Sequence, residues 1–183
     1  MNQLKNIRTF DGNSPQLGKG SFVDPSAVVT GKVILGDDAS VWPNVSIRGD
    51  LMPITIGDGT NVQDNCVIHT SHQSEFYQAA ACTVGKEVTI GHGAILHGCT
   101  IQNQVLIGMH GIVLDQVVIE SKVIVAAGAL VPPGKTLESG YLYVGSPAKQ
   151  ARALTTQELE YFHYSSKAYI KLKNAHVESL KCS

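Results

Sequence analysis

The amino-acid sequence predicts an all-β solenoid of stacked parallel repeats, followed by a C-terminal α-helix. The first observation behind this prediction is an aliphatic residue that recurs at every sixth position through most of the chain. The second is a change near residue 155 from this period to a helical pattern. The third is the composition, because 43% hydrophobic and 16% charged residues support a sizeable core and argue against disorder. We therefore predict a solenoid domain over 1–154 and a helix over 155–183.

The repeat of six is the main evidence for the solenoid. Glycine often follows the marked aliphatic residue, which suits tight turns, while β-branched residues suit short strands. The pattern resembles the hexapeptide repeat of the left-handed parallel β-helix, in which three hexads form one triangular coil. Such coils stack at ~4.8 Å and bury a continuous core between neighbours. The marked positions, with three changes of phase, are Val23, Val29, Leu35, Val41, Ile47; Ile56, Val62, Ile68; Val84, Ile90, Leu96; and Ile101, Ile107, Val113, Ile119, Val125, Val131.

Two segments depart from the repeat before the helix begins. Residues 73–83, QSEFYQAAACT, contain no marked aliphatic residue and are predicted to leave the coil as an excursion, and PPG at 132–134 ends the repeat. Thr155 and Glu158 then have the spacing of a capping box at a helix N-terminus. The helix is expected to pack on the prism or on a neighbouring subunit through one face, which contains Leu159, Phe162, Ser166, Tyr169, Ile170, Val177 and Leu180.

Histidine residues fall at equivalent places of adjacent predicted coils. His69 directly follows the marked Ile68, and His97 directly follows the marked Leu96. If the excursion adds no side to the prism, three hexads separate the two histidines, so their imidazoles stack about one strand spacing apart. Arg48 falls in the same column one coil earlier. We therefore expect Arg48, His69 and His97 along one edge of the prism.

His92 belongs to a different side of the prism. It lies two residues after the marked Ile90, where the same count stacks it over Asp64, with Gln63 beside it. His92 cannot join the other two histidines within its own chain without passing round a corner. Three neutral imidazoles are a common ligand set for a catalytic divalent metal, because they leave one position open for water. A site that uses all three therefore fits best at a subunit boundary of a cyclic trimer; separate surface histidines are the alternative.

Five segments resemble the gamma-class carbonic anhydrase family, over about residues 10–175. They are WPNVSIRGD (42–50), IGDGTNVQDNCVIHTSH (56–72), VTIGHGAILHGCTI (88–101), LIGMHGIVLD (106–115) and VAAGALVPPG (125–134). The resemblance implies a homotrimer with one divalent metal ion at each subunit interface, zinc first, with iron, cobalt and nickel also suited to histidine nitrogens. His69 and His97 would come from one subunit and His92 from its neighbour. The implied activity is reversible hydration of CO2 to bicarbonate by a metal-bound hydroxide.

The same resemblance assigns roles to polar residues near the metal. Arg48 matches an arginine that pairs with an acidic residue across the interface, and Asp64 is the expected partner. Asp50 matches the acidic residue that orders this network. Gln63 matches a glutamine that orients the metal-bound water or bicarbonate, and Asn61 belongs to the same cluster. A purely structural set of ion pairs that holds the trimer together is the alternative role for Arg48, Asp50 and Asp64.

A tyrosine from the C-terminal helix often reaches the site in this family. Tyr161, Tyr164 and Tyr169 are the candidates; Tyr164 is assigned here, and helix packing is the alternative. The sequence also departs from the family's best-studied type. Leu51 stands where that type has a glutamate, and Glu75 is the only acidic residue of a shortened loop. A hydratase must export a proton in each turnover, and His72 and Glu75 are the residues that could replace the missing shuttle.

Two other classes of function stay open. One is acyl transfer or metal-assisted hydrolysis of acyl-CoA thioesters, because the hexapeptide fold and the VGSPAKQARAL segment at 144–154 are common in acyltransferases. The other is a non-catalytic, metal-binding trimeric scaffold. A net charge of −1 offers no basic surface for nucleic acid or anionic membrane, and no apolar run is long enough to cross a bilayer. Four cysteines without metal-site spacing, and no secretory signal, predict a cytoplasmic protein.

Overall fold

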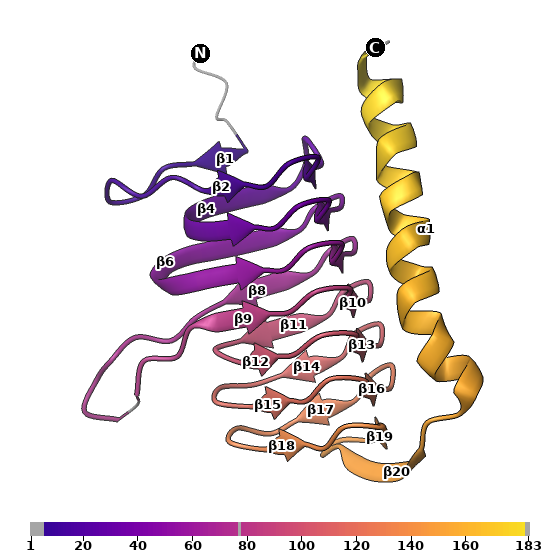
Figure 1. Ribbon diagram of the computed structural model, residues 1–183. Helices are drawn as coiled ribbons and strands as arrows, with labels where there is room; N and C mark the ends of the chain where they lie inside the picture. Colours follow the sequence, from indigo (N-terminus) through magenta and orange to yellow (C-terminus); the bar gives the residue numbers. More distant parts are fainter. Residues whose placement is uncertain (1–5, 77, 182–183) are drawn as a thin grey trace.

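The computed structural model describes residues 6–76 and 78–181 as a triangular parallel coil with one helix along its side (Figure 1). Successive turns of the chain stack on one another, and the pairing between turns is parallel up to the last hairpin. The coil is the left-handed β-helix of hexapeptide repeats that the sequence predicts. The helix runs back along the stack, so that both described ends of the chain lie toward the same end of the molecule (Figure 1).

Three faces of short strands make up the coil. The first face contains β1 (Ile7–Arg8), the start of β4 (Val28–Leu35), the start of β6 (Ser46–Ile56), β8 (Val67–His69), β11 (Ile95–His97), β14 (Ile112–Val113) and β17 (Leu130–Val131). The second contains β2 (Gln16–Leu17), the ends of β4 and β6, β9 (Cys82–Val84), β12 (Thr100–Ile101), β15 (Val118–Ile119) and β18 (Thr136–Leu137). The third contains β3 (Phe22–Val23), β5 (Ser40–Val41), β7 (Asn61–Val62), β10 (Thr89–Ile90), β13 (Leu106–Ile107), β16 (Ile124–Val125), β19 (Tyr141–Val144) and the antiparallel β20 (Lys149–Ala153).

The marked aliphatic residues of the repeat fill the interior of the coil. All of them except Val23 are at most 1% exposed, and each full burial stabilises the fold by roughly 1.5–3 kcal/mol. The register stacks them directly, as where Ile90 pairs with Val62 in one neighbouring coil and with Ile107 in the other. At one corner a Cβ on Gly57 would lie 2.5 Å from the backbone of the next coil, so glycine is required there for close stacking.

Two features of the coil position the site residues. β6 continues from the first face round a corner to the second, and its bend carries Arg48 and Asp50. β8 ends at His69 and β9 begins at Cys82, and the chain between them projects from the coil as an excursion loop on the side away from α1 (Figure 1). An antiparallel bridge between Ser71 and Ala80 closes the base of this loop. The loop therefore starts immediately after one of the predicted metal ligands.

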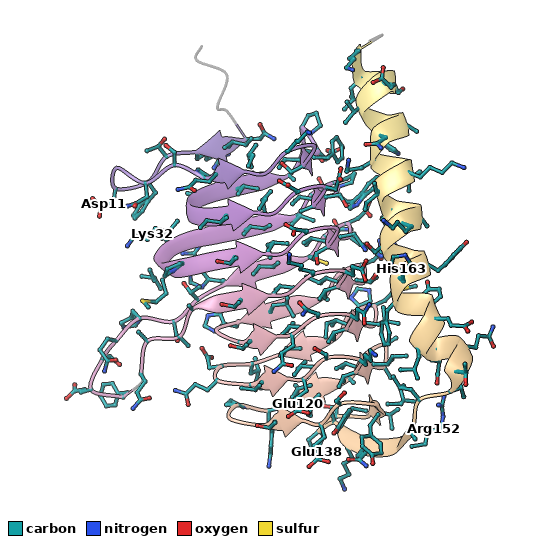
Figure 2. The ribbon with its side chains drawn as sticks, in the orientation of Figure 1. Asp11, Lys32, Glu120, Glu138, Arg152 and His163 are labelled. Atoms are coloured by element: carbon teal, nitrogen blue, oxygen red, sulfur yellow. The ribbon has the colours of Figure 1, made fainter. Side chains whose placement is uncertain are left out.

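The helix α1 (Thr156–Lys181) begins with the predicted capping box. The backbone N–H of Glu158 donates to Oγ1 of Thr155 at 3.2 Å, and the N–H of Thr155 donates to Oε2 of Glu158 at 2.8 Å. Further along, Nδ1 of His163 lies 2.9 Å from Oε1 of Glu87 at a turn of the coil (Figure 2). Among the described residues, no helix combines the length and apolar character needed to cross a bilayer.

The packing face of α1 is more polar than predicted. Its buried residues are Phe162, Ser165, Ser166 and Lys173. Lys173 is 1% exposed, and its Nζ lies 2.8 Å from Oδ1 of Asp38. Leu159 and Leu180 are 40% and 48% exposed, so the coil of the same chain leaves both largely uncovered, and their packing on a neighbouring subunit stays a prediction.

Candidate metal centre

Two histidines lie side by side where the first face ends. β8 and β11 pair in parallel, and their register places His97 opposite His69. Nδ1 of His69 lies 3.2 Å from Nε2 of His97, and the ring centroids are 5.2 Å apart. The same face pairs Ile47 with Ile68, so Arg48 precedes the two histidines in their column. The predicted stack of these side chains along one edge is confirmed.

A carboxylate occupies the other ring nitrogen of each histidine. Nε2 of His69 is 3.0 Å from Oδ1 of Asp50, and Nδ1 of His97 is 2.9 Å from Oδ1 of Asp115. Because an ionised carboxylate can only accept hydrogen bonds, these two ring nitrogens carry the protons. In neutral imidazoles the remaining nitrogens, Nδ1 of His69 and Nε2 of His97, are then both acceptors. The two acceptors face each other.

Asp50 links this pair to Arg48. Nη1 of Arg48 donates to Oδ2 of Asp50, while Oδ1 of Asp50 accepts from His69. Burial raises the pKa of Asp50, but the hydrogen bonds from Arg48 and His69 outweigh burial and hold that pKa below its usual value. Burial lowers the pKa of His69, as does the Arg48 charge, although the Asp50 bond opposes them. Histidine binds metals as a neutral imidazole, commonly with an ionised carboxylate that accepts a hydrogen bond from its second ring nitrogen.

His92 lies on the third face, after β10. Its Nδ1 is 3.0 Å from Oδ2 of Asp64 in the adjacent coil, and the backbone N–H of Gly93 donates to the Asp64 carbonyl at 2.9 Å. The predicted stacking of His92 over Asp64 is therefore confirmed. The same reasoning leaves Nε2 of His92 as an acceptor, on a side chain that is 45% exposed. All three histidines thus share one arrangement, in which a carboxylate holds one nitrogen and leaves the other available.

Gln63 ends a chain of buried hydrogen bonds. Its Nε2 donates to Oδ1 of Asn61 at 3.1 Å, and Nδ2 of Asn61 donates to Oγ1 of Thr89 at 3.1 Å. The Thr89 hydroxyl lies 2.8 Å from Oγ of Ser165 on α1. These four side chains are at most 6% exposed. One N–H of the Gln63 amide bonds Asn61, so its second N–H and its carbonyl oxygen are the groups available to the hollow that Gln63 shares with His92.

The two histidine regions open into different hollows. His69 and His97 line a cleft of about 750 Å³ at the base of the excursion loop, together with Leu51, His72 and Phe76. A separate hollow of about 360 Å³ lies beside His92, Gln63 and the helix. The two hollows have no lining residue in common among the described residues.

The tyrosines of α1 divide between the hollow and solvent. Tyr161 and Tyr169 line the hollow beside His92. Tyr164 is 67% exposed and lies outside that hollow, with its ring centroid 6.0 Å from that of Tyr161. Tyr164 is therefore not beside His92 of its own chain, and its predicted role requires a subunit boundary.

One chain does not complete the predicted metal site. Within residues 6–76 and 78–181, no three metal-binding side chains converge on one point. Arg48 bonds Asp50 of its own chain, whereas Asp64 holds His92. The pairing of Arg48 with Asp64 was expected across an interface, and it stays a prediction.

Asp115 is the site residue that sequence reasoning missed. It lies two residues after the marked Val113, in the coil that directly follows the coil of His97. A signal was present, because an acidic residue one coil beyond a candidate ligand, near its column, is a natural partner for the second ring nitrogen. With the change of phase between Leu96 and Ile101, the hexad count places Leu114 rather than Asp115 in the column of His97, so that count passes over Asp115.

Comparison with known proteins identifies relatives over most of the chain. Residues 14–49 match the family model described as "Bacterial transferase hexapeptide (six repeats)". Protein YrdA of Escherichia coli is 44% identical over 173 residues, which are 94% of this chain and 94% of that protein.

A plant protein and a solved structure are also similar. Gamma carbonic anhydrase 2, a mitochondrial protein of Arabidopsis thaliana, is 40% identical over 170 residues, which are 93% of this chain and 61% of that protein. The crystal structure of a hexapeptide transferase family protein from Anaplasma phagocytophilum has a TM-score of 0.85 and 38% identity, and the match covers 92% of this chain and 96% of that one.

Proposed function

Because this chain belongs to the gamma carbonic anhydrase-like family of hexapeptide-repeat proteins, we propose that it is a metal-dependent carbon dioxide hydratase. The reaction interconverts CO2 and water with bicarbonate and a proton. Its site forms at the subunit boundaries of a homotrimer. There His69 and His97 of one subunit and His92 of its neighbour hold one divalent metal ion.

The observation that carries this proposal is the pair of facing acceptor nitrogens. Nδ1 of His69 and Nε2 of His97 are 3.2 Å apart, and carboxylates hold the proton on the opposite nitrogen of each ring. Two acceptors repel at this distance unless a positive group lies between them. Two nitrogens at about 2.0–2.1 Å from a tetrahedral zinc are about 3.3 Å apart, close to the observed spacing. The donor set suits zinc first, and iron, cobalt and nickel also accept imidazole.

Exposed apolar residues beside each histidine region support assembly through two different faces. Val67 and Ile95 pair in register on the first face, and they are 41% and 38% exposed. On the third face, Leu106 and Met109 line the hollow beside His92, and Met109 is 55% exposed. Contact between the first face of one subunit and the third face of the next is heterologous. Three subunits joined in this way form a closed ring when neighbouring subunits are related by a rotation of about 120°.

Each residue around the metal has a role that follows from its contacts. Asp50, Asp115 and Asp64 fix the tautomer of the three histidines and raise their basicity. When bound, the metal supplies activation of water near neutral pH, the chemistry that CO2 hydration requires. The Gln63 carbonyl accepts a hydrogen bond from water or bicarbonate, and Asn61 holds Gln63 in the orientation that allows this.

Metal content and CO2 hydration test this proposal directly. Protein purified without oxygen is analysed for metal, and hydration is measured by stopped flow on zinc, iron and cobalt forms. We expect about one metal ion per chain and turnover that chelation removes and added metal restores. Bound metal without turnover in any of the three forms would refute the hydratase function.

Subunit mixing tests whether the site is shared. His92→Ala keeps the other two histidines, and His97→Ala keeps His92, so neither homotrimer has a complete site. In a mixed trimer of the two variants, one boundary regains all three ligands. Random assembly of equal amounts therefore restores about a quarter of the complete three-histidine sites and of the wild-type activity. Mixed trimers that regain neither metal nor activity would contradict a shared site.

The size of the cleft favours a second candidate function, metal-assisted hydrolysis of acyl-CoA thioesters. About 750 Å³ is far more than CO2 needs and falls in the usual range for larger organic ligands. The wild type and His92→Ala are therefore also assayed against thioesters of increasing acyl length. If the wild type hydrolyses thioesters but not CO2, and His92→Ala loses the thioester activity, thioester hydrolysis would replace CO2 hydration as the proposed function.

A further inference from the structure

Hydration of CO2 leaves one proton for every bicarbonate that forms, and the proposed site needs a group that removes it. Positioned acid–base groups typically accelerate such transfers by about 10²–10⁴-fold. Leu51 lines the cleft beside the histidine pair, but its side chain cannot accept a proton. Glu75 is exposed on the excursion loop and does not line the cleft. Neither residue therefore connects the cleft to solvent as a proton acceptor.

The cleft itself contains another candidate. The titratable side chains among its described lining residues are His69, His72, His97 and Asp115. His69 and His97 face each other, and Asp115 holds His97, so these three have roles already. His72 is the fourth, and its side chain is exposed at the start of the excursion loop. His72 therefore lines the cleft and is also exposed to solvent.

The chemistry of imidazole suits this position. An unperturbed histidine has a pKa of about 6.5, so near neutral pH it both accepts and releases protons readily. The charged groups of the surroundings are Asp115 in the cleft wall, Glu75 on the same loop, and Asp50 with Arg48 on the far ring nitrogen of His69.

We propose that His72 transfers the proton of each hydration from the cleft to solvent, an assignment that rests on the proposed hydratase function. A neutral ring nitrogen of His72 accepts the proton from water in the cleft, which gives an imidazolium. The imidazolium passes the proton to buffer and returns to the neutral form, while bicarbonate leaves separately. One CO2 and one water thus yield one bicarbonate and one released proton.

Oxygen-18 exchange between CO2 and water, followed by mass spectrometry at chemical equilibrium, separates the two steps. It reports the interconversion of CO2 and bicarbonate, and independently the proton transfer that releases labelled water. We expect His72→Gln, in the metal-loaded trimer, to slow proton transfer by about tenfold or more and to leave interconversion within about twofold. Imidazole buffer is expected to restore proton transfer in this variant.

Glu75→Gln is the matched control, because it removes a titratable group from the same loop but outside the cleft. We expect it to change neither rate. An equal loss in both variants, or a loss that imidazole does not rescue, would overturn the role of His72. A metal-loaded wild type without interconversion would instead overturn the hydratase function, and the His72 assignment with it.

Metal content is the readout besides activity. The metal content of His72→Gln should equal that of the wild type, since His72 is not assigned as a ligand. Loss of metal from this variant would overturn the proposal, because slower turnover would then follow from an empty site.

Discussion

The corner with His69 and His97 and the face with His92 differ in how much of the site one chain builds. At the corner, two imidazoles lie 3.2 Å apart, and their side chains are 16% and 32% exposed. On the face, the side chains of His92 and Asp64 are 45% and 38% exposed. The difference teaches that stacked coils bring residues together along a column but keep different faces apart. A site that needs both regions needs a second subunit.

The two regions also differ in what holds them in place. The backbone register of β8 and β11 positions the corner. The region of His92 depends in addition on α1, because Ser165 ends the hydrogen-bond chain that orients Gln63. Changes in the helix should therefore affect the His92 region more than the corner.

Removing one histidine from each region is expected to have the largest effect on metal binding. His97→Ala destroys the preformed pair, so we expect bound metal to fall well below one ion per chain. His92→Ala keeps the pair, so we expect weaker two-ligand binding that titration calorimetry with zinc still detects. Both variants should keep the proposed trimer in sedimentation, because neither side chain belongs to the core. Unchanged metal content in His97→Ala would remove the basis of the site.

Removing one carboxylate from each region should have a smaller effect. In Asp115→Asn and Asp64→Asn the histidine keeps a polar neighbour, but an amide can present either a donor or an acceptor and no longer fixes the tautomer. We expect each variant to bind metal about 10–100-fold more weakly in competition with a chelator. Asp58→Asn is the control, since Asp58 pairs with Lys86 away from the histidines. Equal affinity in all three variants would contradict an orienting role.

Two buried serines of α1 sharpen the comparison further. Ser165 is 3% exposed and bonds Thr89 in the chain to Gln63, whereas Ser166 is 1% exposed and donates to the Gly59 carbonyl at 2.9 Å. Loss of either hydroxyl should lower the free energy of unfolding by about 1 kcal/mol, measured by denaturant titration. Only Ser165→Ala should also lower kcat severalfold, with metal content unchanged. A similar fall in kcat for Ser166→Ala would mean that lower stability, and not loss of the hydrogen-bond chain to Gln63, reduces kcat.

The smallest expected effect is the pH dependence of the first turn of α1. A hydrogen bond from Arg152, at the base of the helix in Figure 2, and then one from the Thr155 N–H lower the pKa of Glu158 from 4.5 to about 2. Because the folded pKa is the lower one, the unfolded chain takes up the proton first. The stabilisation is complete above about pH 4.5 and is lost as pH falls towards about 2.

Hydrogen exchange of the first-turn amides measures this effect. Exchange protection in that turn should fall through this pH range in the wild type, and the fall should be absent in Glu158→Gln. The effect should be small, because the carboxylate is 26% exposed and salt screens it. Glu160→Gln is the control on the same helix and should retain the wild-type pH profile. Loss of the profile in this control would exclude Glu158 as its source.

The coil and much of the site could be predicted because the period of six assigns each residue a place on the prism. The column of His69 and His97 and the stacking of His92 over Asp64 followed from counting hexads, and the register confirms both. Asp115 was missed because a change of phase moves it off the column. Helical periodicity identifies a face of α1 but not how far the coil of the same chain covers it, and Leu159 and Leu180 on that face are exposed in one chain.

The sequence by itself therefore determined which residues share a column, since backbone pairing between coils repeats with a constant local period. Only the tertiary structure decided which side chains meet between the coil and α1, and which oxygen holds each ring nitrogen. The contact of Thr89 with Ser165 joins residues 76 positions apart, and that of Gly59 with Ser166 joins residues 107 positions apart. Such contacts depend on how the helix docks, which no local repeat encodes.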